Sequence, residues 1–354
     1  MNNRILNISG RDVGYRCKPY IIAEIGTNHE QDIEVAKSMI AEISKTKADS
    51  IKFQIYEPHE IVSSLVRASD YGLEKMFGDI SAFDMFEDYL KTPKDWFPEL
   101  IDYAKGFGLH CGATIHGFEG VKWASSLDFD WVKVASMDHN NTPLLKEMIK
   151  YLRVPILISF GMAVEEDIET SIKILKEHKY GFGIFHCLAA YPPEYDELRM
   201  ENIPYLANKF DVPVGFSDHT VEYQTALSAL YLGAYFFEKH VTWDKTRKGP
   251  DHTFAMEYDE FSSYVTSINT SYILLEEPKF IEPKGKELNN KKNYLKSITY
   301  KNNLDKNHII TEDDVYLVRP GTGIPPKYML SVIGRKINKP VKKDTLVNYS
   351  DLED

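Results

Sequence analysis

The sequence predicts an α/β fold, a (β/α)₈ or TIM barrel followed by a small β-rich module. Short runs rich in β-branched and aromatic residues alternate with segments of helical periodicity along most of the chain. Such an alternation is typical of a parallel sheet covered by helices. Eight such repeats over about 250 residues are the usual size of a closed barrel. An open doubly wound sheet is the alternative, because periodicity alone does not show closure.

The expected strands follow one another between residues 20 and 240. They are "YIIAEIG" (20–26), "SIKFQIY" (50–56), "LHCGATI" (109–115), "WVKVAS" (131–136), "PILISFG" (155–161), "GIFHCLA" (183–189), "PVGFSDH" (213–219) and "AYFFEKH" (234–240). Segments of helical period, such as 32–46 and 165–178, separate them. The long interval 57–89 after the second strand predicts an inserted, partly helical element at the barrel rim.

The sequence changes character near residue 278, which predicts two domains. We expect residues 1–277 to form the barrel and residues 278–293, which are charged and lack apolar periodicity, to form a linker. Residues 294–354 are turn-rich and of a length that suits a small module folding independently.

The composition is that of an ordinary globular protein, with 43% hydrophobic and 27% charged residues among 354 and a formal net charge of −11. This charge disfavours nucleic acid or an anionic membrane as the main partner. The N-terminus has no apolar core of signal-peptide length, and we expect no membrane span. Three cysteines, odd in number and without metal-ligand spacing, indicate reduced thiols in a cytoplasmic protein.

Polar residues gather at the C-terminal ends of the expected strands, where barrel active sites lie. Because a strand alternates faces, residues two apart, such as Ser217 and His219, point the same way. A ring of such residues inside a barrel is costly unless it surrounds a polar ligand. The strand ends carry Glu24, Lys52, Gln54, Thr114, Lys133, Ser136, Asp138, Ser159, His186, Ser217, His219, Glu238 and His240.

His219 and His240, at matching ends of neighbouring strands, predict a metal site. Adjacent parallel strands lie about 5 Å apart, so the two imidazoles can converge on one divalent ion. Two nitrogens with nearby oxygens suit Mn²⁺ or a similar ion that keeps several waters better than a closed zinc site. Two independent core histidines, each bonded to a backbone carbonyl, are the alternative.

Lys52 and Lys133 in apolar strands predict an anionic substrate, because lysine is almost never buried without a partner. The alternative is that both lysines reach the rim and pair with barrel carboxylates. Thr114, Ser136 and Ser217 could donate hydroxyl hydrogen bonds to a phosphate beside Lys133, although each alone is an ordinary strand-end residue.

Two carboxylates, Glu24 and Asp138, are candidate acid–base groups. Salt bridges to Lys52 and Lys133 are the alternative role for both carboxylates.

An ordered set of segments resembles the sialic acid synthase family, which includes the legionaminic and pseudaminic acid synthases. The segments are "IIAEIGTNH", "IKFQ", "VKVAS", "GFSDHT", "FFEKHV", "KGPDHTF" and "VRPGTGI", and the resemblance runs from about residue 18 to the C-terminus. It implies a phosphoenolpyruvate-dependent synthase of nine-carbon acidic sugars. It also implies a divalent metal, Mn²⁺ or else Mg²⁺ or Co²⁺, and an antifreeze-like (SAF) fold for the C-terminal module.

The resemblance further implies roles for single residues. Arg319 matches an arginine that the SAF domain of the partner subunit places over the N-acyl group of the sugar, which implies a homodimer with shared active sites. The other implied residues are Glu24 (attacking water and intermediate), Lys52 and Gln54 (phosphoenolpyruvate and sugar), Thr114, Lys133, Ser136 and Ser217 (phosphate), His219 and His240 (metal), and Tyr191 and Asp251 (sugar).

Three positions depart from the family pattern. Asp138 stands where the family has a glutamate, one methylene longer. Ala189 replaces an asparagine or serine that contacts phosphate, and residues 28–31 read "NHEQ" instead of "NHNG". These departures leave the metal and lysine set intact and leave the exact acceptor sugar open.

The expected reaction joins phosphoenolpyruvate to the open-chain aldehyde of an N-acylated hexosamine, N-acetylmannosamine or a related deoxy diacetamido sugar. A phosphoenolpyruvate-dependent synthase acting on a phosphorylated aldose is one alternative. The antifreeze-like module and the lack of an arginine pair for a second phosphate argue against it. A non-catalytic sugar-binding relative is the other alternative, although retention of the whole polar ring argues against it.

Overall fold

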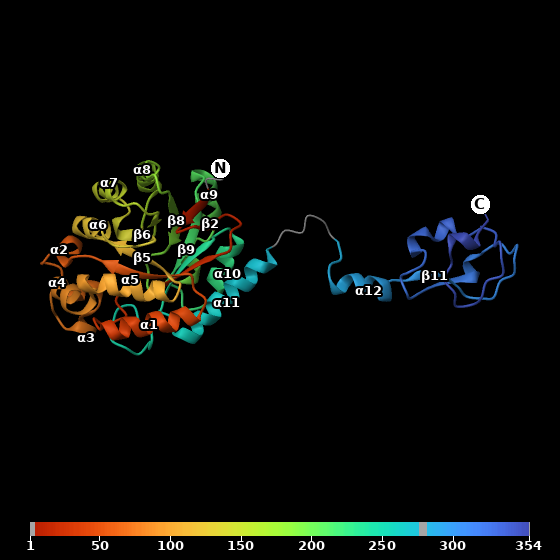
Figure 1. Cartoon of the computed structure of the whole chain (residues 1–354), viewed down its shortest axis with the longest axis horizontal. Helices are drawn as coiled ribbons and strands as arrows, with labels where there is room; N and C mark the ends of the chain where they lie inside the picture. Colours follow the sequence, from red (N-terminus) through yellow and green to blue (C-terminus); the bar gives the residue numbers. More distant parts are fainter. Residues whose placement is uncertain (1–3, 276–281, 354) are drawn as a thin grey trace. The chain divides into compact units, whose positions relative to one another are not determined.

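The computed structural model describes residues 4–275 and 282–353, which belong to two compact units, residues 1–276 and 277–354. In the first unit, eight parallel strands close into a barrel in which the last strand, β10, lies beside the first, β3. Helices surround these strands (Figure 1). Closure confirms the predicted TIM barrel and rules out the open doubly wound sheet.

Each expected strand is present. The barrel strands are β3 (Tyr20–Glu24), β4 (Ser50–Ile55), β5 (His110–Ile115), β6 (Trp131–Val134), β7 (Ile156–Ser159), β8 (Phe182–Cys187), β9 (Val214–Asp218) and β10 (Phe236–His240). The helices around them are α1 (Ile33–Lys45), α5 (Phe97–Gly106), α6 (Phe118–Ala124), α7 (Thr142–Tyr151), α8 (Glu165–Leu175), α9 (Asn202–Phe210), α10 (Gln224–Tyr231) and α11 (Tyr258–Leu274).

Large apolar side chains fill the half of the barrel interior near the strand N-termini. An N-terminal hairpin of β1 (Ile5–Ile8) and β2 (Arg11–Gly14) packs onto this end. The buried cluster that it completes contains Leu6, Ile8, Val13, Tyr20, Ile22, Trp131, Leu157, Phe185 and Phe236. The polar residues of the same strands therefore occupy the other half of the interior, at the strand C-termini.

A rim segment, residues 57–90, connects β4 to the chain before α5. It is partly helical, as the sequence predicts, with α2 (Pro58–Ile61), α3 (Glu74–Phe77), α4 (Ala82–Met85) and a π-helical turn at Phe86–Leu90. Its apolar side chains form a small cluster of their own, separate from the main core: Val62, Ala68, Ala82, Met85 and Leu90.

The second unit contains α12 (Lys286–Tyr294) and a two-stranded antiparallel sheet of β11 (Ser297–Tyr300) and β12 (Val315–Val318). It has its own core, built around Ile298, Tyr300, Val332 and other apolar side chains. Within the expected linker 278–293, residues 278–281 lie outside the described part of the chain, and residues from 286 onward are helical.

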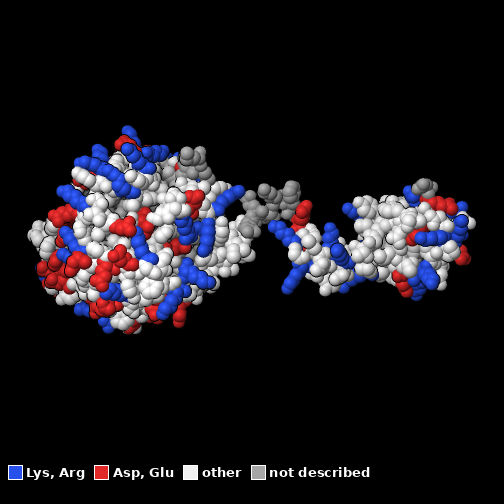
Figure 2. All heavy atoms as spheres, viewed as in Figure 1, with Lys and Arg blue, Asp and Glu red and all other residues white. Residues whose placement is uncertain are grey.

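Charged side chains of both signs are mixed on the visible face of the barrel unit (Figure 2). Cys17, Cys111 and Cys187 are all free cysteines. Among the described residues, no helix combines the length and the apolar character that a membrane crossing requires.

We predict that Gly215→Ala destabilises the barrel. Gly215 lies on β9 and faces the barrel interior, and a Cβ built there would collide with the ring and the carbonyl of Phe236. Overpacking of this kind lowers the free energy of unfolding by about 1–3 kcal/mol. Urea denaturation followed by circular dichroism measures the change.

Gly106→Ala is the matched control, because a Cβ at Gly106 in helix α5 would meet no atom within 4 Å. This variant is expected to be unchanged or more stable by up to about 1 kcal/mol, since alanine favours a helix over glycine. Equal stability of the two variants would contradict the packing argument.

Candidate active site

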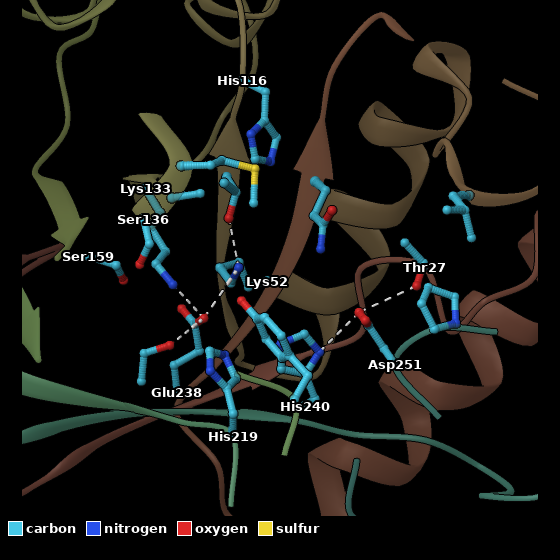
Figure 3. Close-up of a pocket in the computed structure, with 18 of the residues that line it drawn as sticks. Thr27, Lys52, His116, Lys133, Ser136, Ser159, His219, Glu238, His240 and Asp251 are labelled. Carbon is cyan, nitrogen blue, oxygen red and sulfur yellow. Dashed lines mark hydrogen bonds and ion pairs between the residues drawn. The ribbon is translucent and has the colours of Figure 1, made fainter. Parts of the chain in front are cut away.

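A cavity of about 380 Å³ opens among the C-terminal ends of the barrel strands. The rim segment supplies one apolar wall, with Tyr71, Leu73, Met85, Phe86 and Leu90. The barrel supplies the polar side chains, many of which converge on one another in Figure 3. The predicted site residues that line this cavity are Lys52, Gln54, Thr114, Lys133, Ser136, Tyr191, Ser217, His219, His240 and Asp251.

Glu238 lies between the two buried lysines. Its Oε1 atom accepts hydrogen bonds from Lys133 Nζ at 2.5 Å and Ser217 Oγ at 3.2 Å, and Lys52 Nζ lies 3.5 Å away. Burial alone would raise the pKa of Glu238, but Lys133 and Lys52 outweigh it and lower this pKa to about 2. Glu238 therefore stays ionised and serves as the anion that the two ammonium groups require.

The two lysines differ in how well they are compensated. Burial acts to lower the pKa of Lys52, yet Glu238 and Glu24 outweigh it and the pKa is raised. Burial prevails at Lys133, whose pKa is lowered although Glu238 contacts it. Lys133 is thus the cation that gains more from an additional anion in the cavity.

Glu24 is fully buried and lies beside the cavity without lining it. Lys52 Nζ is 2.5 Å from Glu24 Oε2, and Gln54 Nε2 donates to Glu24 Oε1 at 3.1 Å. Lys52 also donates to Thr114 Oγ1 at 2.7 Å. The contacts of Lys52 with Glu24 and of Lys133 with Glu238 are salt bridges of the kind that the sequence left as an alternative. They lie inside the barrel, whereas that alternative placed the lysines at the rim.

Hydroxyl groups surround the Lys133 side of the cavity. Ser136 Oγ accepts from the backbone N–H of Gly161 at 3.0 Å. Ser159 lines the same cavity, and its buried Oγ has no hydrogen-bond partner among the described residues. An orphaned hydroxyl is costly unless a ligand bonds to it. The sequence placed Ser159 at a strand end without giving it a role, and the alternation Leu157, Ser159 was the signal that it faces inward.

His219 and His240 face each other, with ring centroids 5.5 Å apart. His219 Nδ1 lies 3.0 Å from the carbonyl of Leu188, and His240 Nδ1 lies 3.2 Å from Asp251 Oδ2. The Leu188 carbonyl favours a proton on Nδ1 of His219, which leaves its Nε2 lone pair as a potential metal ligand. His240 Nδ1 has no hydrogen-bond partner among the described residues, so the ring nitrogens of His240 are also open to a metal. Burial, reinforced by His240, lowers the pKa of His219 to about 3, so this ring is neutral at pH 7.

These histidines fit a divalent metal that takes its remaining ligands from water or substrate. Among the described residues, no group of three or more His, Cys, Asp and Glu side chains is placed to hold a metal by itself. Asp251 Oδ2 lies 3.2 Å from His240 Nδ1, and a carboxylate so close to a histidine ligand helps to orient its ring.

Three predicted or strand-end residues lie elsewhere. Asp138 does not line the cavity, and its Oδ2 atom is 2.7 Å from His116 Nδ1. Arg319 belongs to the second unit, where Nε donates to the carbonyl of Tyr294 at 3.2 Å. His186 is bonded to the carbonyl of Leu198 at 2.7 Å, outside the cavity lining.

Comparison with known proteins finds a family match for each of the two units. The NeuB family model matches residues 39–279, and the SAF domain model matches residues 296–353. The N,N'-diacetyllegionaminic acid synthase of Legionella pneumophila is 28% identical over 99% of this chain and 99% of that protein. The N-acetylneuraminate-9-phosphate synthase of Homo sapiens is 30% identical over 96% of this chain and 94% of that protein. A solved N-acetylneuraminic acid synthetase from Leptospira borgpetersenii, 27% identical, has a TM-score of 0.70 over 81% of this chain and 95% of its own.

We predict that Glu238→Gln destabilises the fold, because Lys133 then loses its carboxylate partner and only Glu24 remains, in contact with Lys52. Breaking a buried pair in this way costs about 3 kcal/mol of unfolding free energy. Glu42→Gln, which removes a surface pair with Lys45, is the control and is expected to cost less than about 1 kcal/mol. Urea denaturation at pH 7 compares the two.

The lowered pKa of Glu238 also predicts how the destabilisation caused by Glu238→Gln changes with pH. A lowered pKa means that ionised Glu238 stabilises the folded state above a pH of about 4.5, the ordinary value, and that this contribution is lost as the pH falls toward 2. The stability difference between wild type and Glu238→Gln should therefore shrink over this range. A difference that is constant from pH 7 to pH 3 would contradict the assignment.

Proposed function

This chain belongs to the NeuB family of sialic acid-type synthases, and we propose that it condenses phosphoenolpyruvate with the open-chain aldehyde of an N-acylated hexosamine. The products are a nine-carbon 2-keto acid and inorganic phosphate. One observation carries the proposal: two ammonium groups, Lys133 and Lys52, share a single cavity with the facing imidazole rings of His219 and His240. This pairing supplies a place for the phosphate ester beside a place for the metal and the aldehyde.

Phosphoenolpyruvate is proposed to bind beside Lys133. Charge attraction and hydroxyl hydrogen bonds hold a phosphate group well in a buried site. The free hydroxyl of Ser159 and the underneutralised Lys133 support this placement. The proposed phosphate and carboxylate partners are Lys52, Thr114, Lys133, Ser136, Ser159 and Ser217.

His219 and His240 are proposed to hold the metal, Mn²⁺ or alternatively Mg²⁺ or Co²⁺. When bound, a divalent metal supplies Lewis-acid polarisation of the aldehyde oxygen. The chain itself contributes the orientation of the two rings, through the Leu188 carbonyl and Asp251. Tyr191 and Phe254 pack against the His219 ring, with centroids at 4.4 and 6.1 Å, and keep it in place.

The bond changes assign further roles. C3 of phosphoenolpyruvate bonds to the aldehyde carbon, whose oxygen takes up a proton and becomes a hydroxyl. A water oxygen adds to C2, the bond from C2 to the phosphate oxygen breaks as C2 becomes a ketone, and the second proton of the water leaves with the phosphate. Glu24 is proposed to accept the first proton of that water, because Lys52 and Gln54 hold its carboxylate beside the cavity. Tyr191 and Asp251 are proposed to contact the sugar. Holding both substrates face to face supplies a large part of the acceleration.

The acceptor is proposed to be unphosphorylated. Among the described residues, Lys52 and Lys133 are the only lysine or arginine side chains that line the cavity, and phosphoenolpyruvate occupies both. A second phosphate would therefore lack a cation there. N-acetylmannosamine and deoxy diacetamido hexoses are the acceptors to compare with their phosphorylated forms.

We predict that phosphate is released from phosphoenolpyruvate only when both a divalent metal and an unphosphorylated N-acyl hexosamine are present. His219→Ala and His240→Ala should each lower this release by at least about 100-fold, because the remaining ring cannot hold the metal alone. A molybdate assay measures phosphate, and mass spectrometry identifies the nine-carbon product.

His178→Ala is the control for the loss of a buried histidine, since His178 is bonded to the Val154 carbonyl away from the cavity. It should keep near wild-type turnover. Activity of His219→Ala or His240→Ala close to wild type, after metal removal and reconstitution, would reject the metal assignment. Turnover only with phosphorylated acceptors would reject the acceptor assignment.

The active site is proposed to be shared in a homodimer, with Arg319 of one subunit serving the barrel of the other, as the family resemblance implies. Mixing inactive His219→Ala with inactive Arg319→Ala tests this. Random exchange of subunits should restore about a quarter of wild-type activity, because half of the dimers then contain one intact site. No recovery after verified subunit exchange would contradict sharing.

A further inference from the structure

His116 lines the cavity, yet the reaction proposed above gives it no role. It follows β5, and its backbone N–H donates to the carbonyl of Ile55 at 3.2 Å, which extends the ladder between β4 and β5. Gly112, Thr114 and His116 are each two residues apart, so all three face the interior. Figure 3 shows His116 across the cavity from His219 and His240.

Among the described residues, Nδ1 of the His116 ring has a hydrogen-bond partner and Nε2 has none. Nδ1 lies 2.7 Å from Asp138 Oδ2, and the ring of Tyr56 packs edge-on at 6.0 Å. A carboxylate oxygen accepts, so Nδ1 is the donor in this contact, and in that tautomer of the imidazole the lone pair lies on Nε2. Within the described part of the chain, no group hydrogen-bonds Nε2. The lone pair therefore remains available to a ligand.

Asp138 lies behind this ring. Its carboxylate does not line the cavity, so it meets a ligand only through His116. The aspartate is one methylene shorter than the glutamate of the family pattern. His116 lines the cavity and contacts Asp138, which does not line it.

The lone pair also identifies which substrate it can bind. Phosphoenolpyruvate presents carboxylate and phosphate oxygens, which are acceptors and cannot donate to Nε2. An acceptor sugar presents several hydroxyl groups, each of which can donate. A buried acceptor atom that meets a hydroxyl rejects analogues that lack the hydroxyl, because it is then left unpaired.

We propose that His116 is a specificity-determining residue that accepts a hydrogen bond from one hydroxyl of the acceptor sugar. Asp138 is a positioning residue that fixes the tautomer and the plane of the His116 ring. This inference rests on the proposed function, because it assumes a polyhydroxylated acceptor in this cavity.

The test compares wild type and His116→Ala with N-acetylmannosamine and a series of analogues that each lack one hydroxyl. In the wild type, one of these deletions should lower kcat/KM by about 10- to 100-fold through loss of the bond to Nε2. In His116→Ala that penalty should disappear, while the other penalties and the KM for phosphoenolpyruvate stay within about twofold. An unchanged pattern of penalties in His116→Ala would overturn the proposal.

His59→Ala is the matched control, because His59 also faces a carboxylate, Glu119 at 3.5 Å, but on the surface and outside the cavity lining. It should show the wild-type pattern. A control that also loses the penalty would mean that the effect is not specific to the cavity, and would count against the proposal.

Asp138 has a readout independent of turnover. Long-range ¹H–¹⁵N NMR of the imidazoles, assigned with His116→Ala, should show His116 protonated on Nδ1 in the wild type. Asp138→Asn should shift this tautomer and reduce the kcat/KM penalty for the analogue that lacks the bonded hydroxyl. Asp138→Glu, which retains a carboxylate, should preserve both the tautomer and the penalty. A wild-type ring protonated on Nε2 would overturn the proposal. A wild type that releases no phosphate with any acceptor would instead contradict the proposed function, and this inference with it.

Discussion

The site depends on one buried carboxylate held between two buried ammonium groups. Glu238 Oε1 lies 2.5 Å from Lys133 Nζ and 3.5 Å from Lys52 Nζ, and Lys133 relies on it, whereas Lys52 also contacts Glu24. This arrangement holds both ammonium groups inside the barrel at the cavity. Burial nevertheless keeps the pKa of Lys133 lowered, which is why the proposed function pairs this lysine with the phosphate ester.

The scaffold makes this arrangement possible by separating apolar from polar halves of one interior. Trp131 and Phe236 fill the end covered by the N-terminal hairpin, and they fit only because Gly112 and Gly215 on neighbouring strands have no Cβ. The same strands then present Lys133 and Glu238 two residues further on. Rigid packing at one end thus fixes the positions of the charges at the other.

Much of this could be predicted from the sequence, because strand alternation is a local signal. Eight short apolar runs separated by helical segments predicted the strands and favoured the barrel. Residues two apart in these runs gave the inward direction of Lys52, Lys133, His219 and His240. The role of Glu238 did not follow, because its partners come from distant strands. His116 was missed because it lies one residue beyond its strand, and Asp138 was expected in the cavity because nothing local shows that another side chain stands in front of it.

The rim segment has a consequence for how this protein can change over evolutionary time. Its short helices pack around their own small apolar cluster, so substitutions in that cluster leave the packing of the barrel core unchanged. Yet Tyr71, Leu73 and Phe86 form one wall of the cavity. Substitutions in this segment can therefore reshape one wall of the cavity without disturbing the paired charges of the barrel interior, whose members each depend on the others.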